Sequence, residues 1–136
     1  MMIVSETDER RREEHRQYVE RMKNRTKKLS LRVIQMVRAL PEDEAARVLG
    51  KQVLRSATSI GANYRAACRV RTGKEFAAKL RIVCEETDET QYWIELLMES
   101  GFMRESQLCD LHTECTELLA MFSTALATTR QRLRKK

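Results

Sequence analysis

The fold class is decided by residues 73–100, which read GKEFAAKLRIVCEETDETQYWIELLMES. Along this stretch, apolar and small polar side chains recur at steps of three and four residues: Phe76, Leu80, Val83, Thr87, Thr90, Ile94 and Leu97. This spacing is typical of one face of an α-helix. Thr72 with Glu75 predicts a capping box at its start, and Ser100-Gly101 predicts its end. We therefore predict one long amphipathic helix over residues 73–100.

The chain before this stretch predicts two more helices with the same spacing. The first should begin near Glu6, behind the capping residue Ser5, and run to Leu40. Pro41 ends it and suits the first turn of a second helix over about residues 42–70. Within this second helix, the small residues of 56–63 make one flank unusually thin, which favours a close approach of another helix.

A fourth helix is predicted over about residues 104–133, and the four together predict the architecture. The apolar stripes repeat close to every 3.5 residues, the period of left-handed helix packing. The joining loops are short, so sequential helices should be antiparallel neighbours. We predict an all-α fold, an up-down-up-down antiparallel four-helix bundle of left-handed twist. Residues 1–20 form a charged N-terminal extension, and residues 21–136 form the bundle domain.

Composition excludes several other classes of protein. Among 136 residues there are four glycines and one proline, too few for the many turns of a β-sandwich. No apolar run approaches the ~18 residues of a membrane span. The apolar start, residues 1–4, is too short for the core of a signal peptide. These features predict a cytoplasmic protein without a membrane partner.

Positive charge is concentrated in the first predicted helix. The chain carries 26 basic and 20 acidic side chains, and residues 21–40 contain no acid at all. A basic surface attracts polyanions, although a solvated helix face accounts for the same charge. The first-choice phosphate contacts are Arg21, Lys23, Arg25, Lys27, Lys28 and Arg32. The second-choice contacts are Arg65, Arg69 and Arg71. Aromatic residues are only 5%, which favours contacts to phosphate and shape over base-by-base recognition.

Acidic residues gather in the middle of the third predicted helix, at Glu85, Glu86, Asp88 and Glu89. In an antiparallel bundle, the middle of the second helix should lie opposite them. We expect Arg55 to pair with Asp88 or Glu85, and Ser59 and Asn63 to add hydrogen bonds between the helices. These groups are interpreted as structural.

Catalytic chemistry has few candidates in this sequence. The two histidines do not form the paired Glu-x-x-His motifs of di-iron bundles, and no close cysteine pair suggests zinc. We therefore predict no metal, no cofactor and no enzyme activity. Arg10 and His15 have the Arg-x4-His spacing of helical HEPN ribonucleases, within a stretch so charged that chance explains the match. The four cysteines are expected to be buried, reduced side chains.

Three spaced motifs resemble the family of 23S rRNA intervening-sequence proteins. They are RSATSIGANYR at residues 55–65, GKEF at 73–76 with Leu80 after it, and EETDETQYWIELL at 85–97. The resemblance covers about residues 25–130. It implies an up-down bundle that assembles as a ring-shaped pentamer. It also implies kinship with the accessory protein of diversity-generating retroelements, a basic pentamer that binds a reverse transcriptase and RNA.

Together, the residues and the resemblance predict a non-enzymatic homo-oligomer, a pentamer, that binds nucleic acid through a basic surface. Structured RNA is favoured over DNA. One alternative is a protein-interaction adaptor, for example a reverse transcriptase partner, docked through the charged helix 6–28. A further alternative is a ribonuclease that uses Arg10 and His15. Steep salt dependence would distinguish RNA binding from apolar docking.

Overall fold

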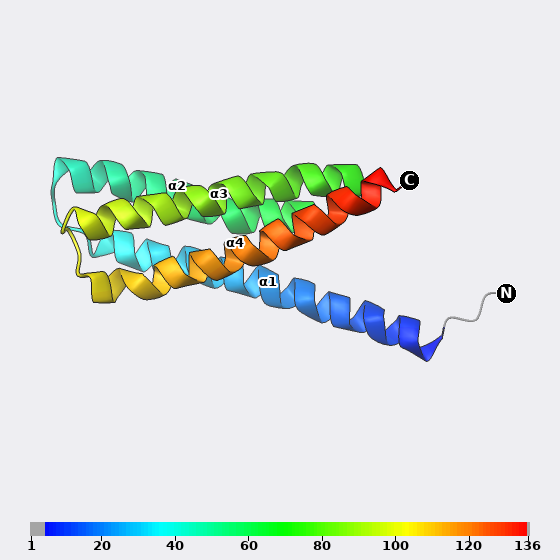
Figure 1. The fold of residues 1–136 in the computed structure, drawn as a ribbon. Coiled ribbons are helices and arrows are strands. Elements are labelled where there is room, and N and C mark those ends of the chain that lie inside the picture. The colour runs from blue at the N-terminus through cyan, green and yellow to red at the C-terminus, as the bar shows by residue number, and fades with distance from the viewer. Residues whose placement is uncertain (1–4, 136) are drawn as a thin grey trace.

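The computed structural model describes residues 5–135 and contains four helices in that range. The apolar start of the chain, residues 1–4, and the last lysine lie outside the described residues. The helices are α1 (Glu6–Arg38), α2 (Glu44–Ala67), α3 (Gly73–Glu99) and α4 (Glu105–Arg134). They alternate in direction and lie side by side (Figure 1), and the described part of the chain contains no strand. The all-α prediction is confirmed, whereas the left-handed twist stays a prediction.

The helices begin largely where their capping residues predicted. The Ser5 side chain accepts a hydrogen bond from the Asp8 amide, and the Thr72 side chain accepts one from the Glu75 amide. The prediction that Pro41 lies in the first turn of the second helix was wrong. Asp43 caps α2 by accepting from the Ala46 amide at 3.0 Å, so proline lies in the connection before it. An aspartate side chain satisfies a free helix amide, which a proline ring at the start of a helix does not do.

The apolar stripes of all four helices meet in one core. Each helix contributes fully buried side chains, among them Val33, Ile60, Ile94 and Leu118, each with 0% exposure. Helix α3 lies against both α2 and α4, and α1 lies mainly against α2. Burial of such side chains contributes about 1.5–3 kcal/mol each, which is the main stabilisation of a bundle whose loops are short.

Helix α1 packs against the thin flank of α2, residues 56–63. A Cβ atom added at Gly61 would lie 3.3 Å from Oγ1 of Thr26, so the absent side chain lets the helices approach closely. Thr26 is fully buried and its hydroxyl donates to the backbone oxygen of Met22. The flank therefore sets helix approach within the bundle.

The N-terminal part of α1 leaves the bundle. All side chains of residues 6–17 are exposed, and burial begins only at Tyr18 and Val19. Helix α1 nevertheless continues without a break through residue 20. Figure 1 shows this part of α1 diverging from the other three helices toward the N-terminus. Residues 6–17 include no apolar side chain that could draw the helix back onto α4.

The cysteine prediction was partly wrong. All four thiols are free, but only Cys115 is buried, whereas Cys68 and Cys84 are half-buried and Cys109 is exposed. Cys109 lies one position after Leu108 on the first turn of α4, which rotates it about 100° away from the core. Burial raises the pKa of Cys115 to about 12, so this thiol stays protonated. None of the described helices is long and apolar enough to cross a bilayer.

Candidate nucleic-acid interface

The basic residues predicted in the first helix do not share one face of α1. At about 100° per residue, Arg21, Arg25, Lys28 and Arg32 follow the side of α1 that turns toward α4. Lys23 and Lys27 lie on the other side of the core stripe. The sequence therefore overestimated the width of a single basic surface on this helix.

Arg25 is held by two carboxylates of α4. Its Nη2 atom lies 2.5 Å from Oε1 of Glu114 and 3.1 Å from Oε2 of Glu117. The hydrogen bond to Glu114 raises the pKa of Arg25 above its ordinary value. This guanidinium therefore fastens α1 to α4, and its charge is locally neutralised.

The other first-choice residues have more open surroundings. Arg21 lies over the ring of Tyr18, with 5.9 Å between the guanidinium carbon and the ring centroid. Lys23 is 3.7 Å from Glu20. The remaining three, namely Lys27, Lys28 and Arg32, form no ion pair with any residue in the range 5–135, and Arg32 is half-buried.

The second-choice residues lie at one end of the bundle, where more basic residues join them. Antiparallel packing brings the last turns of α4 beside the start of α3, and a Cβ atom at Gly73 would lie 3.3 Å from Leu133. The seven exposed basic residues gathered there, which we call the basic end, are Arg65, Arg69, Arg71, Lys74, Arg130, Arg132 and Arg134. None of them has a carboxylate partner among the described residues.

The contribution of α4 to this surface was not predicted from the sequence. The basic residues at the end of α4 complement the negative end of the helix dipole, and that role alone explained them in sequence. Their second role depends on α3 and α4 being antiparallel. In an up-down bundle, the α2–α3 turn and the C-terminus of α4 lie at the same end. The predicted topology could therefore have indicated that their basic residues lie near one another.

Charge is separated along the length of the bundle. Residues 65–79 carry five basic and one acidic side chain, and residues 124–135 carry four basic and no acidic ones. By contrast, residues 85–117 carry ten acidic side chains and one basic side chain. A cluster of one sign produces a local potential that attracts ligands of the other sign. The basic end is therefore a surface of the described chain that attracts anions.

The predicted partners of Arg55 were wrong. Arg55 pairs with Glu86, at 3.3 Å, and with Glu89. Glu85 instead pairs with Arg81 of its own helix at 2.8 Å, and Asp88 is exposed. The stripe that faces α2 includes Thr87 and Thr90, so the residues directly before these two flank the interface. Glu85 and Asp88 are rotated about 100° further out.

Ser59 and Asn63 also differ from the prediction of bonds between helices. The Asn63 amide donates to the backbone oxygen of Ser59, 2.9 Å away on the same helix. A buried side-chain hydrogen bond between α2 and α3 is instead formed by Thr90, whose hydroxyl donates to Oγ of Ser56 at 2.7 Å. Both hydroxyls are on fully buried residues. Small polar residues within the apolar stripe, rather than beside it, were the signal for this contact.

Arg10 and His15 lie on the exposed part of α1. Five positions apart on a helix, they are separated by about 140° around its axis. The helix therefore does not bring the two side chains to one face. Across residues 5–135, no group of three or more His, Cys, Asp or Glu side chains could hold a metal ion.

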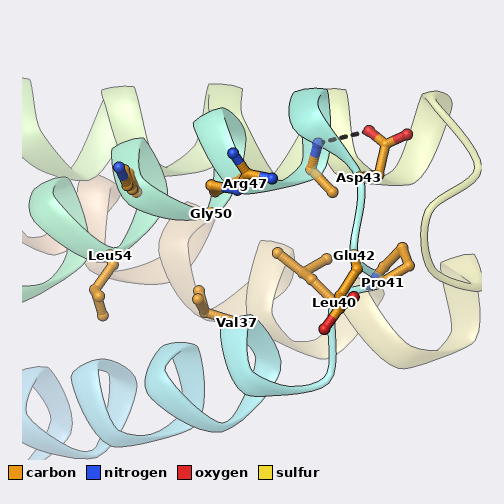
Figure 2. A pocket seen from close by; sticks show the side chains of 10 residues that line it. Val37, Leu40, Pro41, Glu42, Asp43, Arg47, Gly50 and Leu54 are labelled. Carbon is orange, nitrogen blue, oxygen red and sulfur yellow. Dashed lines mark hydrogen bonds between the residues drawn. The ribbon is translucent and has the colours of Figure 1, made fainter.

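The opposite end of the bundle carries a shallow pocket of about 390 Å³. Figure 2 shows Val37 and Leu40 of the α1 end facing Gly50 and Leu54 of α2. Its charged lining is mixed in sign, with Glu42, Asp43, Arg47 and Lys51. This pocket thus lacks the single sign of charge that marks the basic end.

The chain is similar to a known protein family and to a solved structure. The family model described as 23S rRNA-intervening sequence protein matches residues 20–124. A solved structure from Bacteroides thetaiotaomicron, described as a protein with unknown function from the S23 ribosomal protein family, is 30% identical. The alignment covers 77% of this chain and 97% of that one, with a TM-score of 0.72. No curated protein matches the chain.

Proposed function

Because the chain belongs to the family of 23S rRNA-intervening sequence proteins, we propose that it binds structured RNA through the basic end. The observation that carries this proposal is the gathering of exposed basic residues from α2, α3 and α4 without carboxylate partners in the described chain. Lysine and arginine side chains that neutralise phosphates supply the sequence-independent part of nucleic-acid affinity. Lys27 and Lys28 of α1 are the secondary contacts in this proposal.

Structured RNA is favoured over DNA by the shape of the basic end and by its composition. Its charges come from three helix ends, and exposed aromatic side chains on which bases could stack are few. Double-stranded RNA is recognised largely through its shape, its phosphates and its 2′-hydroxyl groups. In this proposal the protein acts as a non-enzymatic scaffold.

We also propose that the scaffold is a homo-oligomer, a ring of five chains. A single bundle offers one basic end and hence few phosphate contacts. Several basic ends on one particle would bind a folded RNA with a much higher effective concentration. Sedimentation velocity at micromolar concentration tests this, and a particle of 15.9 kDa would contradict it.

Charge reversal at the basic end tests the RNA proposal. We expect Arg69→Glu with Arg71→Glu to weaken binding of a structured RNA by about tenfold or more, measured by fluorescence anisotropy. The salt slope should fall by roughly 1.4–1.8 units if two phosphate contacts are lost. Binding of a duplex DNA of equal length, measured alongside, should be weaker.

The matched control is Arg47→Glu with Lys51→Glu, which changes the net charge equally at the opposite end. Both of these side chains are exposed. This variant should retain most of the affinity. If both double variants lose affinity equally, binding follows net charge alone, and the basic end is not the site.

A second pair of substitutions ranks the two basic surfaces. Lys27→Glu with Lys28→Glu removes the unpaired lysines of α1. We expect a smaller loss than at the basic end, because these two lysines lie about 100° apart on one helix. A larger loss would place the main RNA contact on α1.

A further inference from the structure

A large apolar groove opens beside the basic end, between α1 and α4. Its volume is about 920 Å³, and its lining comes from all four helices. The floor is formed by Tyr64, Leu80 and Phe122, which are almost fully buried. A groove of this size and lining is typical of a binding site rather than of an ordinary protein surface.

The groove exists because the apolar stripe of α1 does not reach the N-terminal end of the helix. Toward the N-terminus, the stripe stops at Tyr18 and Val19, which are half-buried. The helix continues beyond them as a charged arm over residues 6–17. Helix α4 still presents half-buried Ala125 and Leu133 beyond that point. Figure 1 shows the two helices moving apart in this region. A position that a complete bundle would fill with α1 is thus left open.

The dimensions of the groove suit an α-helix. Its wall on α4 extends from Met121 to Leu133, which corresponds to about 18 Å of helix. About 12 residues of a bound helix would match that length. Helices that dock in this way insert apolar side chains at steps of three and four residues.

The charged residues around the groove indicate the sign of the charge that a bound partner would carry. Glu20 is the one carboxylate of the lining. Four basic residues and one histidine also line the groove: His15, Arg16, Lys23, Arg71 and Arg132. Arg16 and Lys23 have acidic partners on α1, whereas Arg71 and Arg132 have none in the described chain. A helix with acidic flanks would meet these two free guanidinium groups.

The charged arm of a second copy does not fit this groove, since residues 6–17 contain no apolar side chain. The exposed large apolar residues of the chain, Leu31, Val48 and Tyr92, come from three different helices and form no stripe. We propose that the groove binds an amphipathic helix of a partner protein, with its apolar stripe in the groove and acidic residues on its flanks. This protein-docking site adds to the RNA-binding function and does not depend on it.

The test uses the full-length protein and fluorescein-labelled helical peptides of about 14 residues. One peptide carries leucines at helical spacing flanked by glutamates, and its counterpart carries lysines in place of the glutamates. We expect the acidic peptide to bind with roughly micromolar affinity and the basic one about tenfold or more weakly. Absence of binding by the acidic peptide, or equal binding of both, would overturn the proposal.

A groove-filling substitution locates the binding site. Thr128 lines the groove on α4, and its exposed neighbour Ala127 does not. Thr128→Trp should weaken binding of the acidic peptide about tenfold, whereas Ala127→Trp should leave it unchanged. Circular dichroism of both variants checks that they fold. Equal binding by both folded variants would place the peptide elsewhere and overturn the proposal.

The same variants separate this proposal from the RNA proposal and from self-association. Thr128→Trp changes no charge, so RNA affinity should be retained even where peptide binding is lost. If Thr128→Trp instead lowers the sedimenting mass while Ala127→Trp does not, the groove is occupied by a second copy, which would overturn the partner-helix assignment.

Discussion

The two ends of this bundle are built from the same four helices but differ in how completely they are packed. At the end with the α1–α2 and α3–α4 connections, Met36, Ala46, Leu97 and Leu108 are all buried, one from each helix. At the basic end, α2, α3 and α4 still pack, but α1 contributes nothing beyond Tyr18 and Val19. The first end has four-helix packing, and the second has three-helix packing beside an open groove.

This difference shows that one helix can serve two purposes when its apolar stripe covers only part of its length. Where the stripe is present, hydrophobic burial holds the helix in the core. Where it stops, the helix stays exposed and its neighbours keep an uncovered apolar surface. We expect stability to depend on the packed end, and binding to depend on the basic end.

The largest effect should come from the same substitution made at both ends. Leu97→Ala removes a side chain with 0% exposure at the packed end and should lower the free energy of unfolding by about 2–5 kcal/mol. Leu133→Ala removes a half-buried groove residue, so its cost should be within about 1 kcal/mol. Urea denaturation of both variants measures the difference. Equal costs would contradict the contrast between the two ends.

A smaller loss is expected where α1 is seated on α2. Gly61→Leu places a side chain against Thr26 and should lower the free energy of unfolding by about 1–3 kcal/mol. Ala62→Leu, at the exposed next position of the same helix, should change it by less than about 0.5 kcal/mol. Thermal and urea unfolding would measure both. A stable Gly61→Leu protein would mean that α1 can move away from α2 at little cost.

Arg25 links α1 to α4 near the place where the two helices separate. A double-mutant cycle of Arg25→Gln and Glu114→Gln should give a coupling energy of about 0.2–1 kcal/mol, because the pair is partly exposed. RNA affinity of Arg25→Gln should stay close to that of the unchanged protein. A strong loss of RNA affinity without a loss of stability would assign Arg25 to the interface instead.

The smallest effect concerns pH and Glu86. Burial raises the pKa of Glu86 above its ordinary value of 4.5, despite the opposing effect of Arg55. The folded state therefore holds this proton more tightly than the unfolded chain does. Its contribution to stability is present at low pH and is lost as pH rises through the raised pKa.

Glu86→Gln should remove this dependence. The free energy of unfolding of the unchanged protein, relative to that of the glutamine variant, should fall as pH rises from about 4 to 7. Subtracting the two urea series removes the contribution of the other carboxylates. A difference that rises with pH would show that the ion pair with Arg55 outweighs burial.

The sequence predicted the helices well and the side-chain pairs poorly. Caps at Ser5 and Thr72 and the periodic apolar residues placed most helix ends within a few residues, since both signals act locally. The partners of Arg55 were missed by one position along α3, because the rotation of a helix about its axis is fixed by its whole stripe. One residue of error turns a side chain by about 100°.

The candidate site shows the same difference between local features, which the sequence predicted, and contacts between helices, which it did not. Sequence analysis found Arg65, Arg69 and Arg71, which are close neighbours along the chain. It did not connect them with Arg132 and Arg134, because residues so distant in sequence meet only through the antiparallel packing of α3 and α4. Nor did it detect that Arg25 is neutralised, since its partners lie on α4.

The sequence by itself determined the four helices, the residues of their core stripes and the charged arm, because helix formation and amphipathicity depend on neighbours a turn away. Only the tertiary structure decided which charges are free, which are paired, and where an apolar surface is left uncovered. Those properties depend on the axial rotation and the divergence of whole helices, which many buried contacts determine together.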